Sequence, residues 1–178
     1  MPGPLDLIKS FTVSKQVVYI GGDPMPYVAE VTIPGITAPT ETFNNTSTGG
    51  ELEVADPWRK MPDGDGEIKI EAEDKALAAK IYDSTKIQSL KLSCAVNALN
   101  PQLGQFLPLP IVYTIGAQFF GVDPGAIAQG KKRDITAKFK MFNYKMSQNF
   151  IDVVDFDFAN GVYLVNGADL LALVGAIL

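Results

Sequence analysis

Residues 67–73 alternate without a break between charged and apolar side chains, and this pattern constrains the fold more than any other stretch. The segment reads Glu-Ile-Lys-Ile-Glu-Ala-Glu. Successive side chains of a β-strand point to opposite faces, so every charge falls on one face and every apolar side chain on the other. Such a strand needs a core on one side and water on the other, as in an antiparallel sheet. We therefore expect a sheet with one wet, charged face.

The segments before this strand are expected to form a long arm. Residues 27–34 resemble a strand, residues 43–50 form a polar tip, and residues 51–54 return toward the sheet. A polar connection of this length inside a compact domain is usually functional or disordered. We predict an extended β-arm around residues 36–52, with a floppy tip in the isolated chain as the open alternative.

The rest of the chain predicts more strands around one short helix. The helix is expected at about residues 74–84, because Asp74 can cap it and Leu77 and Ile81 share one face. Turn signals at residues 21–26 predict a first hairpin, and Pro108 and Pro110 are expected to break later strands. Strands are expected at residues 11–20, 86–98, 109–120, 134–146, 150–158 and 161–165. This pattern predicts a mainly β fold, an antiparallel β-barrel or sandwich, in a single domain of residues 1–178.

The chain ends in an apolar stretch that is expected to form a helical segment. Asn166 and Asp169 form an approximate capping box before the apolar residues 170–174. A helix that is apolar on nearly all sides is not a solvated surface helix. It is expected either to fold onto its own core or to be buried by another copy.

Composition excludes several classes of function. The 178 residues carry a formal net charge of −5, which argues against a surface built to grip nucleic acid. The single cysteine, Cys94, cannot form an internal disulfide and is expected to be a small buried hydrophobe. We expect neither a signal peptide nor a membrane anchor, because the start has no basic segment followed by an apolar one and no apolar run is long enough to span.

The sequence also lacks the usual catalytic residues. There is no histidine, which removes the commonest general base and the commonest transition-metal ligand. Residues 125–132 resemble a phosphate loop but lack the hydroxyl after the lysine, and residues 63–67 lack the distal Glu of a calcium loop. No enzyme activity, metal or cofactor is expected.

Two groups of charged residues could still be given a function. Asp152, Asp155 and Asp157 are the best candidates for paired-carboxylate chemistry of the glycosidase kind, although acidic side chains facing water explain them equally. Six basic residues are expected to form a solvated face with acidic neighbours and not a nucleic-acid track. These are Lys131, Lys132, Arg133, Lys138, Lys140 and Lys145.

The order of three segments resembles a known family. Residues 30–36 read Glu-Val-Thr-Ile-Pro-Gly-Ile, the polar tip ends in Gly49-Gly50, and residues 165–171 read Val-Asn-Gly-Ala-Asp-Leu-Leu. In this order, and with a short helix at residues 75–84, the chain resembles the major tail tube proteins of contractile-tailed phages and phage-tail-like bacteriocins. The resemblance covers roughly residues 17–171, and the chain departs from it at residues 56–62 and 170–178.

The resemblance implies a structural subunit of an inner tube. It implies hexameric rings of identical subunits stacked head to tail around a central lumen, with a sheath outside, a baseplate below and a tape-measure protein as a further partner. DNA would be only in transit through the lumen. Synthesis in the bacterial cytoplasm and assembly into a virion tail or tail-like particle are implied as well. The rivals are a ligand-binding or hydrolytic β-sandwich domain that uses the acidic strands, and the similar ring protein of type VI secretion.

Two sets of residues are predicted to serve the tube. The alternating charges and the negative net charge predict an acidic or mixed lumen wall, because a basic lining would hold DNA back. The predicted lumen residues are Glu51, Glu53, Glu67, Lys69, Glu71 and Glu73. The predicted contacts between subunits are Phe43, Asn44, Asn45, Thr46, Ser47, Thr48, Leu170, Leu171 and Leu173.

Overall fold

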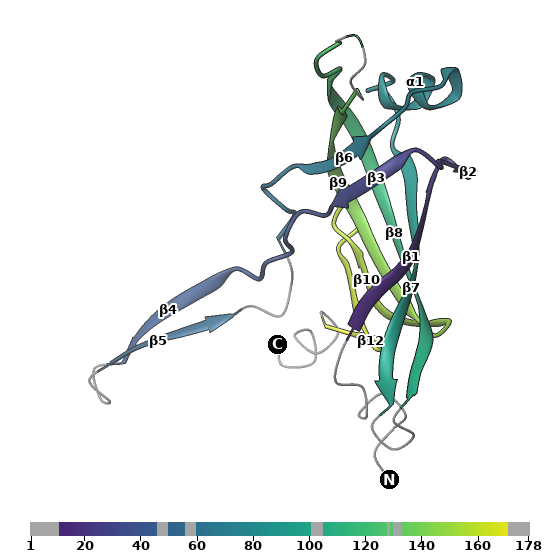
Figure 1. Ribbon diagram of the computed structural model, residues 1–178. Helices are drawn as coiled ribbons and strands as arrows, with labels where there is room; N and C mark the ends of the chain where they lie inside the picture. The colour runs from purple at the N-terminus through teal and green to yellow at the C-terminus, as the bar shows by residue number, and fades with distance from the viewer. Residues whose placement is uncertain are drawn as a thin grey trace.

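Strands dominate the molecule, and most of them belong to one strongly curved antiparallel sheet (Figure 1). The structure is a computed structural model that describes residues 11–45, 50–55, 60–100, 105–127, 129 and 133–170. The elements are β1 Phe11–Ile20, β2 Asp23–Pro24, β3 Val28–Thr32, β4 Thr40–Asn45, β5 Gly50–Ala55, β6 Gly66–Ile70, α1 Lys75–Ile81, β7 Gln88–Asn100, β8 Gln105–Asp123, β9 Ile135–Gln148, β10 Ile151–Asp157, β11 Val162–Val165 and β12 Ala168–Asp169.

The strand β9 is where the sheet divides. One edge of β9 pairs with β8, from Ile111 opposite Gln148 to Asp123 opposite Thr136. The other edge is shared: β6 pairs with the first part of β9, and β10 pairs with the second part. The sheet therefore continues in two directions, to β6 and β3 at one end of the molecule and to β10, β11 and β12 at the other.

The core lies inside the curve of the sheet, at the end where β6 pairs with β9. Ile68 and Ile70 of β6 are fully buried and face the core, together with the rings of Phe119 on β8 and Phe139 on β9. The two rings meet edge to face, with their centroids 5.8 Å apart. Ile68 and Ile70 thus form the apolar face of the strand that the alternation predicted. The strand ends at Ile70, so residues 71–73 lie beyond it.

The helix α1 closes one end of this core, as predicted. The carboxylate of Asp74 accepts a hydrogen bond of 2.7 Å from the Leu77 N–H and so caps the first turn. Leu77 and Ile81 are both buried in the core. The helix ends at Ile81, a few residues earlier than the pattern indicated.

The predicted class is confirmed: the fold is mainly antiparallel β with one short helix and a long β-arm. The predicted first hairpin is wrong, because β1 pairs with β7 along its whole length and β3 pairs with β6. A turn does form within residues 21–26, but the strand that it pairs with β1 is only the two-residue β2. Long-range pairing decided the partners of β1 and β3.

Pro108 and Pro110 do not break a strand, contrary to expectation, because both lie within β8. The N–H of Asn149 donates to the carbonyl oxygen of Pro110 at 3.0 Å, so the main-chain groups of Pro110 face the β9 side and not β7. Pro108, two residues earlier, faces the same way. Pairing of β8 with β9 stops at Ile111, so both prolines occupy an edge where no N–H is needed.

The expected cap of a C-terminal helix is also wrong. Asn166 and Gly167 have φ values of +50° and +76° and form the two-residue turn between β11 and β12. Asn-Gly favours this hairpin turn, because both positions need positive φ. Asp169 belongs to β12, and residues 171–178 lie outside the described residues.

Candidate functional site

Pairs of opposite charge cover the outer face of the sheet formed by β3, β6 and β9. Glu67 on β6 lies opposite Lys138 on β9, with 3.6 Å between the charged atoms. Lys69, the next outward residue of β6, lies opposite Glu30 on β3, and its Nζ donates to the Glu30 carboxylate at 2.7 Å. This hydrogen bond raises the pKa of Lys69. The face is therefore charged but locally balanced.

The balance extends beyond β6 itself. Lys140 pairs with Asp65 at 2.6 Å, and Arg133 pairs with Glu73 at 3.4 Å. Every one of these pairs joins segments that are far apart in the sequence, and so none was visible as a local motif. The prediction of a solvated basic face with acidic neighbours is confirmed for Arg133, Lys138 and Lys140, and for Lys145 of β9, whose partners lie on β10. Lys131 and Lys132 lie outside the described residues.

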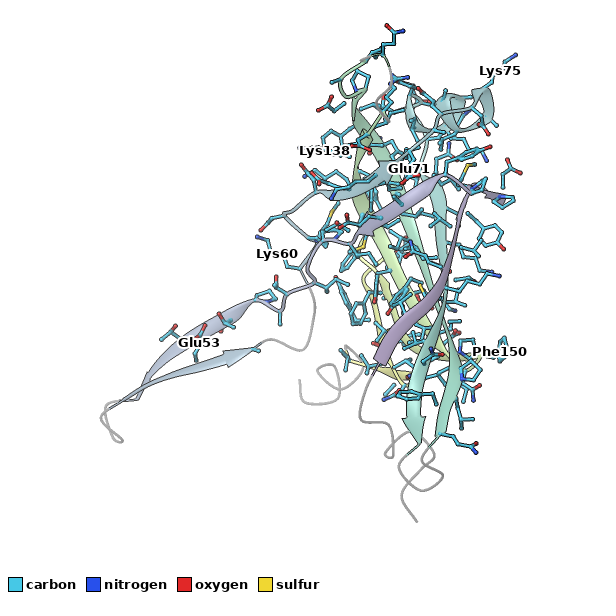
Figure 2. All side chains as sticks on the ribbon, in the orientation of Figure 1. Glu53, Lys60, Glu71, Lys75, Lys138 and Phe150 are labelled. Atoms are coloured by element: carbon cyan, nitrogen blue, oxygen red, sulfur yellow. The ribbon has the colours of Figure 1, made fainter. Side chains whose placement is uncertain are left out.

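The structure brings together only some of the predicted lumen residues. Glu67 and Lys69 share the outer face of β6, while Glu71 and Glu73 follow the end of that strand. Glu53 lies on β5, well away from Lys138 and Glu71 (Figure 2). Glu51 lies on the same strand as Glu53. Within one subunit, the six predicted residues therefore belong to two separate surfaces.

Sequence reasoning predicted a solvated face for Lys138 and Lys140 but did not predict that they share it with Glu67 and Lys69. The sequence places them in a basic run, apart from the acidic strand. The register of β6 against β9 puts Glu67 directly opposite Lys138, so any surface that uses one also uses the other. A cross-strand charge match of this kind is detectable only after the strands have been aligned.

The hairpin β4–β5 forms the arm, and it is a second sheet that projects from the rim of the first (Figure 1). Its register runs from Thr40 opposite Ala55 to Asn45 opposite Gly50. At its base the Lys60 N–H donates to the Thr37 carbonyl oxygen at 3.0 Å. Pro34 and Pro62, beside this base, are buried. The arm is thus held at its root while Glu41, Thr42 and Glu53 are exposed.

The predicted contact residues fall partly on this arm. Phe43, Asn44 and Asn45 lie on β4, and Leu170 follows β12, where its N–H donates to the Tyr163 carbonyl oxygen at 2.9 Å. The remaining predicted contacts lie outside the described residues. These are Thr46, Ser47, Thr48, Leu171 and Leu173.

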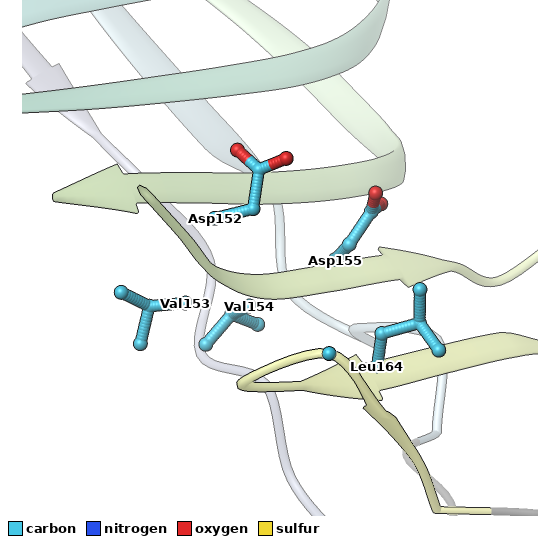
Figure 3. A pocket seen from close by; sticks show the side chains of 6 residues that line it. Asp152, Val153, Val154, Asp155 and Leu164 are labelled. Carbon is cyan, nitrogen blue, oxygen red and sulfur yellow. The ribbon is translucent and has the colours of Figure 1, made fainter. Parts of the chain in front are cut away.

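The acidic strand β10 provides no pair of carboxylates suited to acid–base catalysis. A bulge between Asp152 and Val154 turns the side chains of Asp152 and Asp155 to the same side of the strand (Figure 3). Both carboxylates pair with Lys145, at 2.7 and 3.4 Å. Lys145 first, and then the Ser147 hydroxyl, hold the pKa of Asp152 below its usual range. A glycosidase acid needs a raised pKa. The open hollow of about 150 Å³ beside these residues is lined mainly by the strand itself.

The third carboxylate of this strand, Asp157, has a local structural role. Asn160 donates to it at 2.6 Å through its side-chain amide, and this contact lowers the pKa of Asp157. The carboxylate also accepts the N–H groups of Ala159 and Asn160 at 3.1 Å. Asp157 therefore orders the turn between β10 and β11.

We predict that Asp152→Asn lowers the melting temperature slightly at pH 7 and has no effect in strong acid. The pKa of Asp152 is lower in the folded state than in the unfolded state. The ionised carboxylate therefore stabilises the folded protein above the unfolded pKa, and this stabilisation is lost as the pH falls through the folded pKa. Thermal unfolding of both proteins between pH 2 and 7 measures this. A difference in melting temperature that stays constant down to pH 2 would show that the ion pair with Lys145 is not the cause.

The acidic residues at the start of β6 and in the loop before it are also paired. The carboxylate of Asp63 lies 2.7 Å from Lys60, and Asp65 and Glu67 pair with Lys140 and Lys138. Among the residues that the structure describes, no group of three or more His, Cys, Asp or Glu side chains is placed to hold a metal ion. Over the same residues, no helix is long and apolar enough to cross a membrane.

A curved sheet with a charge-balanced outer face and a projecting hairpin suits a structural subunit. The chain belongs to the phage tail tube protein FII family, whose profile matches residues 11–178. Comparison with curated proteins finds no match.

Two solved structures have a similar fold. The first is the cryo-EM structure of an extracellular contractile injection system, PVC sheath/tube terminator in extended state, with a TM-score of 0.54 and 10% identity over 76% of this chain and 95% of that chain. The second is the PVC sheath-tube complex in extended state of the same kind of system, with a TM-score of 0.54 and 9% identity over 76% of this chain and 90% of that chain. At these identities the similarity concerns the fold.

Proposed function

We propose that this tail tube protein builds the inner tube of a contractile injection machine, a phage tail or a phage-tail-like bacteriocin particle. Identical subunits assemble into hexameric rings, and the rings stack around a central lumen. The observation that carries the proposal is the family membership over residues 11–178, together with a hairpin arm that projects from the rim of the sheet. An isolated two-stranded hairpin is marginally stable in water, so an arm of this kind needs a partner surface.

We place the charge-balanced face of β3, β6 and β9 on the wall of the lumen. The wall would be lined by Glu67, Lys69, Lys138 and Lys140. Its border would carry Glu71 and Glu73, and the arms would add Glu51 and Glu53. The paired charges give a polar wall with little net attraction for phosphate, because nucleic-acid affinity comes from unneutralised Lys and Arg. DNA would then slide through without being held.

A thiol at position 67 tests this placement. In a Cys94→Ser background, Glu67→Cys should react with a bulky maleimide polymer in the free subunit and at least tenfold more slowly in closed tubes, while a small maleimide reacts in both. The background removes the native thiol, whose pKa burial already raises. Lys91→Cys, on the exposed surface of β7, is the comparison position. Equal reaction of Glu67→Cys with the bulky reagent in both states would place this face outside the lumen.

The contacts between neighbouring subunits are assigned to the arm and to the end of the chain. Phe43 to Thr48 would meet the adjacent subunit, and Leu170, Leu171 and Leu173 would be covered by a neighbour. The two similar structures come from a sheath/tube terminator and a sheath-tube complex, which supports a sheath outside this tube. A baseplate and a tape-measure protein complete the proposed partners. Synthesis in the bacterial cytoplasm would precede assembly into the tail.

Particle size separates this function from the rival ligand-binding or hydrolytic β-sandwich. A tube subunit should sediment as rings or longer polymers as its concentration rises. A single monomeric species at all concentrations and salt conditions would contradict the proposal. Sedimentation velocity from low to high micromolar concentration is a sufficient measurement.

A further inference from the structure

One hairpin turn of the sheet carries a residue that is poorly suited to it. Three two-residue turns in the described chain have positive φ at both positions: Gly21-Gly22, Asn149-Phe150 and Asn166-Gly167. Two of them have glycine second, as such turns favour. The third has Phe150, with φ at +64°. A bulky residue in this region is uncommon and costly, so its presence suggests a function outside the turn itself.

The ring of Phe150 has no place in the core of its own subunit. Phe150 is 88% exposed, and the next residue, Ile151, is 66% exposed. The turn lies at one end of the sheet, opposite the end that carries α1 (Figure 2). Beside it β8 extends past the end of its pairing with β9 and exposes Phe106, at 63%, and Leu107. Phe150 and Ile151 form what we call the turn-end patch, and Phe106 and Leu107 are exposed on the part of β8 that extends beyond it.

The main chain next to this patch is not available for strand addition. Pro108 and Pro110 lie where β8 no longer pairs with β9 and have no N–H to donate, and the Pro110 carbonyl oxygen already accepts the Asn149 N–H. A partner at this end would therefore be held through side chains. An exposed aromatic ring on a rigid turn is a common anchor for this kind of contact.

The opposite end of the same strand β8 carries a hollow of matching size. A β-bulge between Phe119 and Gly121 leaves Phe120 out of the β8–β9 register; its side chain is 48% exposed, and the Lys140 Nζ lies 5.7 Å from the centre of its ring. Phe120 and Tyr82 line an open hollow of about 220 Å³, with Ser84 and Val122 also on its wall. This volume is enough for one phenyl side chain, in a hollow that is open to solvent and has a wall more polar than apolar.

The two ends are arranged for a repeating contact. From Pro110, beside the turn of Phe150, to Phe120, β8 spans about 33 Å at roughly 3.3 Å per residue. A protruding ring at one end and a hollow at the other are different surfaces on one molecule. Contact between such surfaces is heterologous and adds subunits in one direction without limit, whereas contact between identical surfaces stops at a pair.

We propose that Phe150 of one copy inserts into the hollow between Tyr82 and Phe120 of a second copy, and that this contact joins successive rings of the tube. The proposal rests on the proposed tube function and assigns its axial contact to named side chains. Ile151, next to the anchor in the chain, is exposed as well.

The substitution Phe150→Gly tests the proposal because it should leave the stability of the free subunit unchanged or higher while it weakens tube assembly. Glycine suits the positive φ, so the melting temperature of the free subunit should stay equal or rise by about 2–4 °C. Loss of the anchor should raise the critical concentration for tube formation at least tenfold and leave single rings. Phe150→Tyr keeps the ring and should assemble as the wild type does.

Electron microscopy of wild type and variants distinguishes the outcomes. Single rings of Phe150→Gly beside wild-type tubes support the proposal. Normal tubes of Phe150→Gly overturn it while the tube function stands. A wild type that forms neither rings nor tubes contradicts the proposed function itself, and with it this contact.

Disulfide formation identifies the receiving surface. In a Cys94→Ser background, the double variant Phe150→Cys, Tyr82→Cys should give a ladder of covalent multimers when it is oxidised above its raised critical concentration, where tubes are present, and neither single variant should. A dimer from Phe150→Cys alone would mean a symmetric contact and would overturn the proposal. The absence of a ladder from the double variant would show that Phe150 meets another partner, such as an arm or a sheath subunit.

Discussion

Replacing the arm by a short turn should abolish tube formation and leave the subunit folded. The ends of the arm already meet in the bridge between Thr37 and Lys60, so an Asn-Gly turn can join them in place of residues 38–59. The hairpin β4–β5 is a separate two-stranded sheet, and the core cluster is built from other elements. We expect the free energy of unfolding to change by less than about 1 kcal/mol, since a lone hairpin contributes little stability.

Two measurements check this expectation. Urea denaturation reports the stability of the shortened subunit, and sedimentation reports its assembly. Amide exchange adds a direct test on the intact protein: the N–H groups of β4 and β5 should exchange rapidly in the free subunit and be protected in tubes. Thr42→Ser, a mild change on the exposed arm, is the control and should assemble normally. Tubes built by the shortened subunit would remove the arm from the account of assembly.

The largest stability effects are expected at the contact between Gly66 and Phe139. Gly66 lies directly opposite Phe139 in the pairing of β6 with β9, and the ring covers the glycine. A Cβ added at Gly66 would lie 2.1 Å from the Phe139 ring, which is fully buried and cannot move away freely. Gly66→Ala should therefore cost about 1–3 kcal/mol through overpacking, and Phe139→Ala about 3–5 kcal/mol through the cavity it leaves.

The double variant shows whether these two residues act through one contact. Once the ring is removed, the alanine at position 66 has room, so Gly66→Ala should cost much less in the Phe139→Ala background. Gly64→Ala is a matched control, because its added Cβ would meet only Pro34 at an ordinary 3.7 Å. Additive losses in urea denaturation would mean that the steric contact is not the cause.

Local patterns predicted the parts of the fold that local physics decides. The alternation of residues 67–73 correctly placed Ile68 and Ile70 in the core and Glu67 and Lys69 on the wet face. Asp74, with Leu77 and Ile81, predicted the helix, its cap and its buried side. In each case the deciding interaction lies within one turn of helix or one strand.

Pairing between distant segments could not be predicted in the same way. Nothing in β1 alone indicates β7 as its partner, and nothing in residues 67–73 indicates that Lys138 will lie opposite Glu67. The bulge at Val153 broke the simple alternation of β10, so Asp152 and Asp155 share Lys145 although they are three residues apart. Pro108 and Pro110 look like breaks until the free edge of β8 is known. Register and edges are properties of the whole sheet.

The candidate surfaces were also predictable only where local sequence determines them. The acidic residues of β6 were visible from their periodicity, whereas the neutralising lysines needed the register. Phe150 was also overlooked, because in the sequence Asn149-Phe150 does not have the composition of a two-residue hairpin turn. Its positive φ and exposed ring were evident only in the structure.

Helical reconstruction of the purified protein by electron cryomicroscopy tests the central claim most directly. We expect hollow tubes of stacked six-subunit rings, with Glu67, Lys69 and Lys138 facing the lumen and the arm lying against a neighbouring subunit. A protein that remains a single particle under all assembly conditions would contradict the account. A tube with the β3–β6–β9 face on its outside would contradict the proposed lumen.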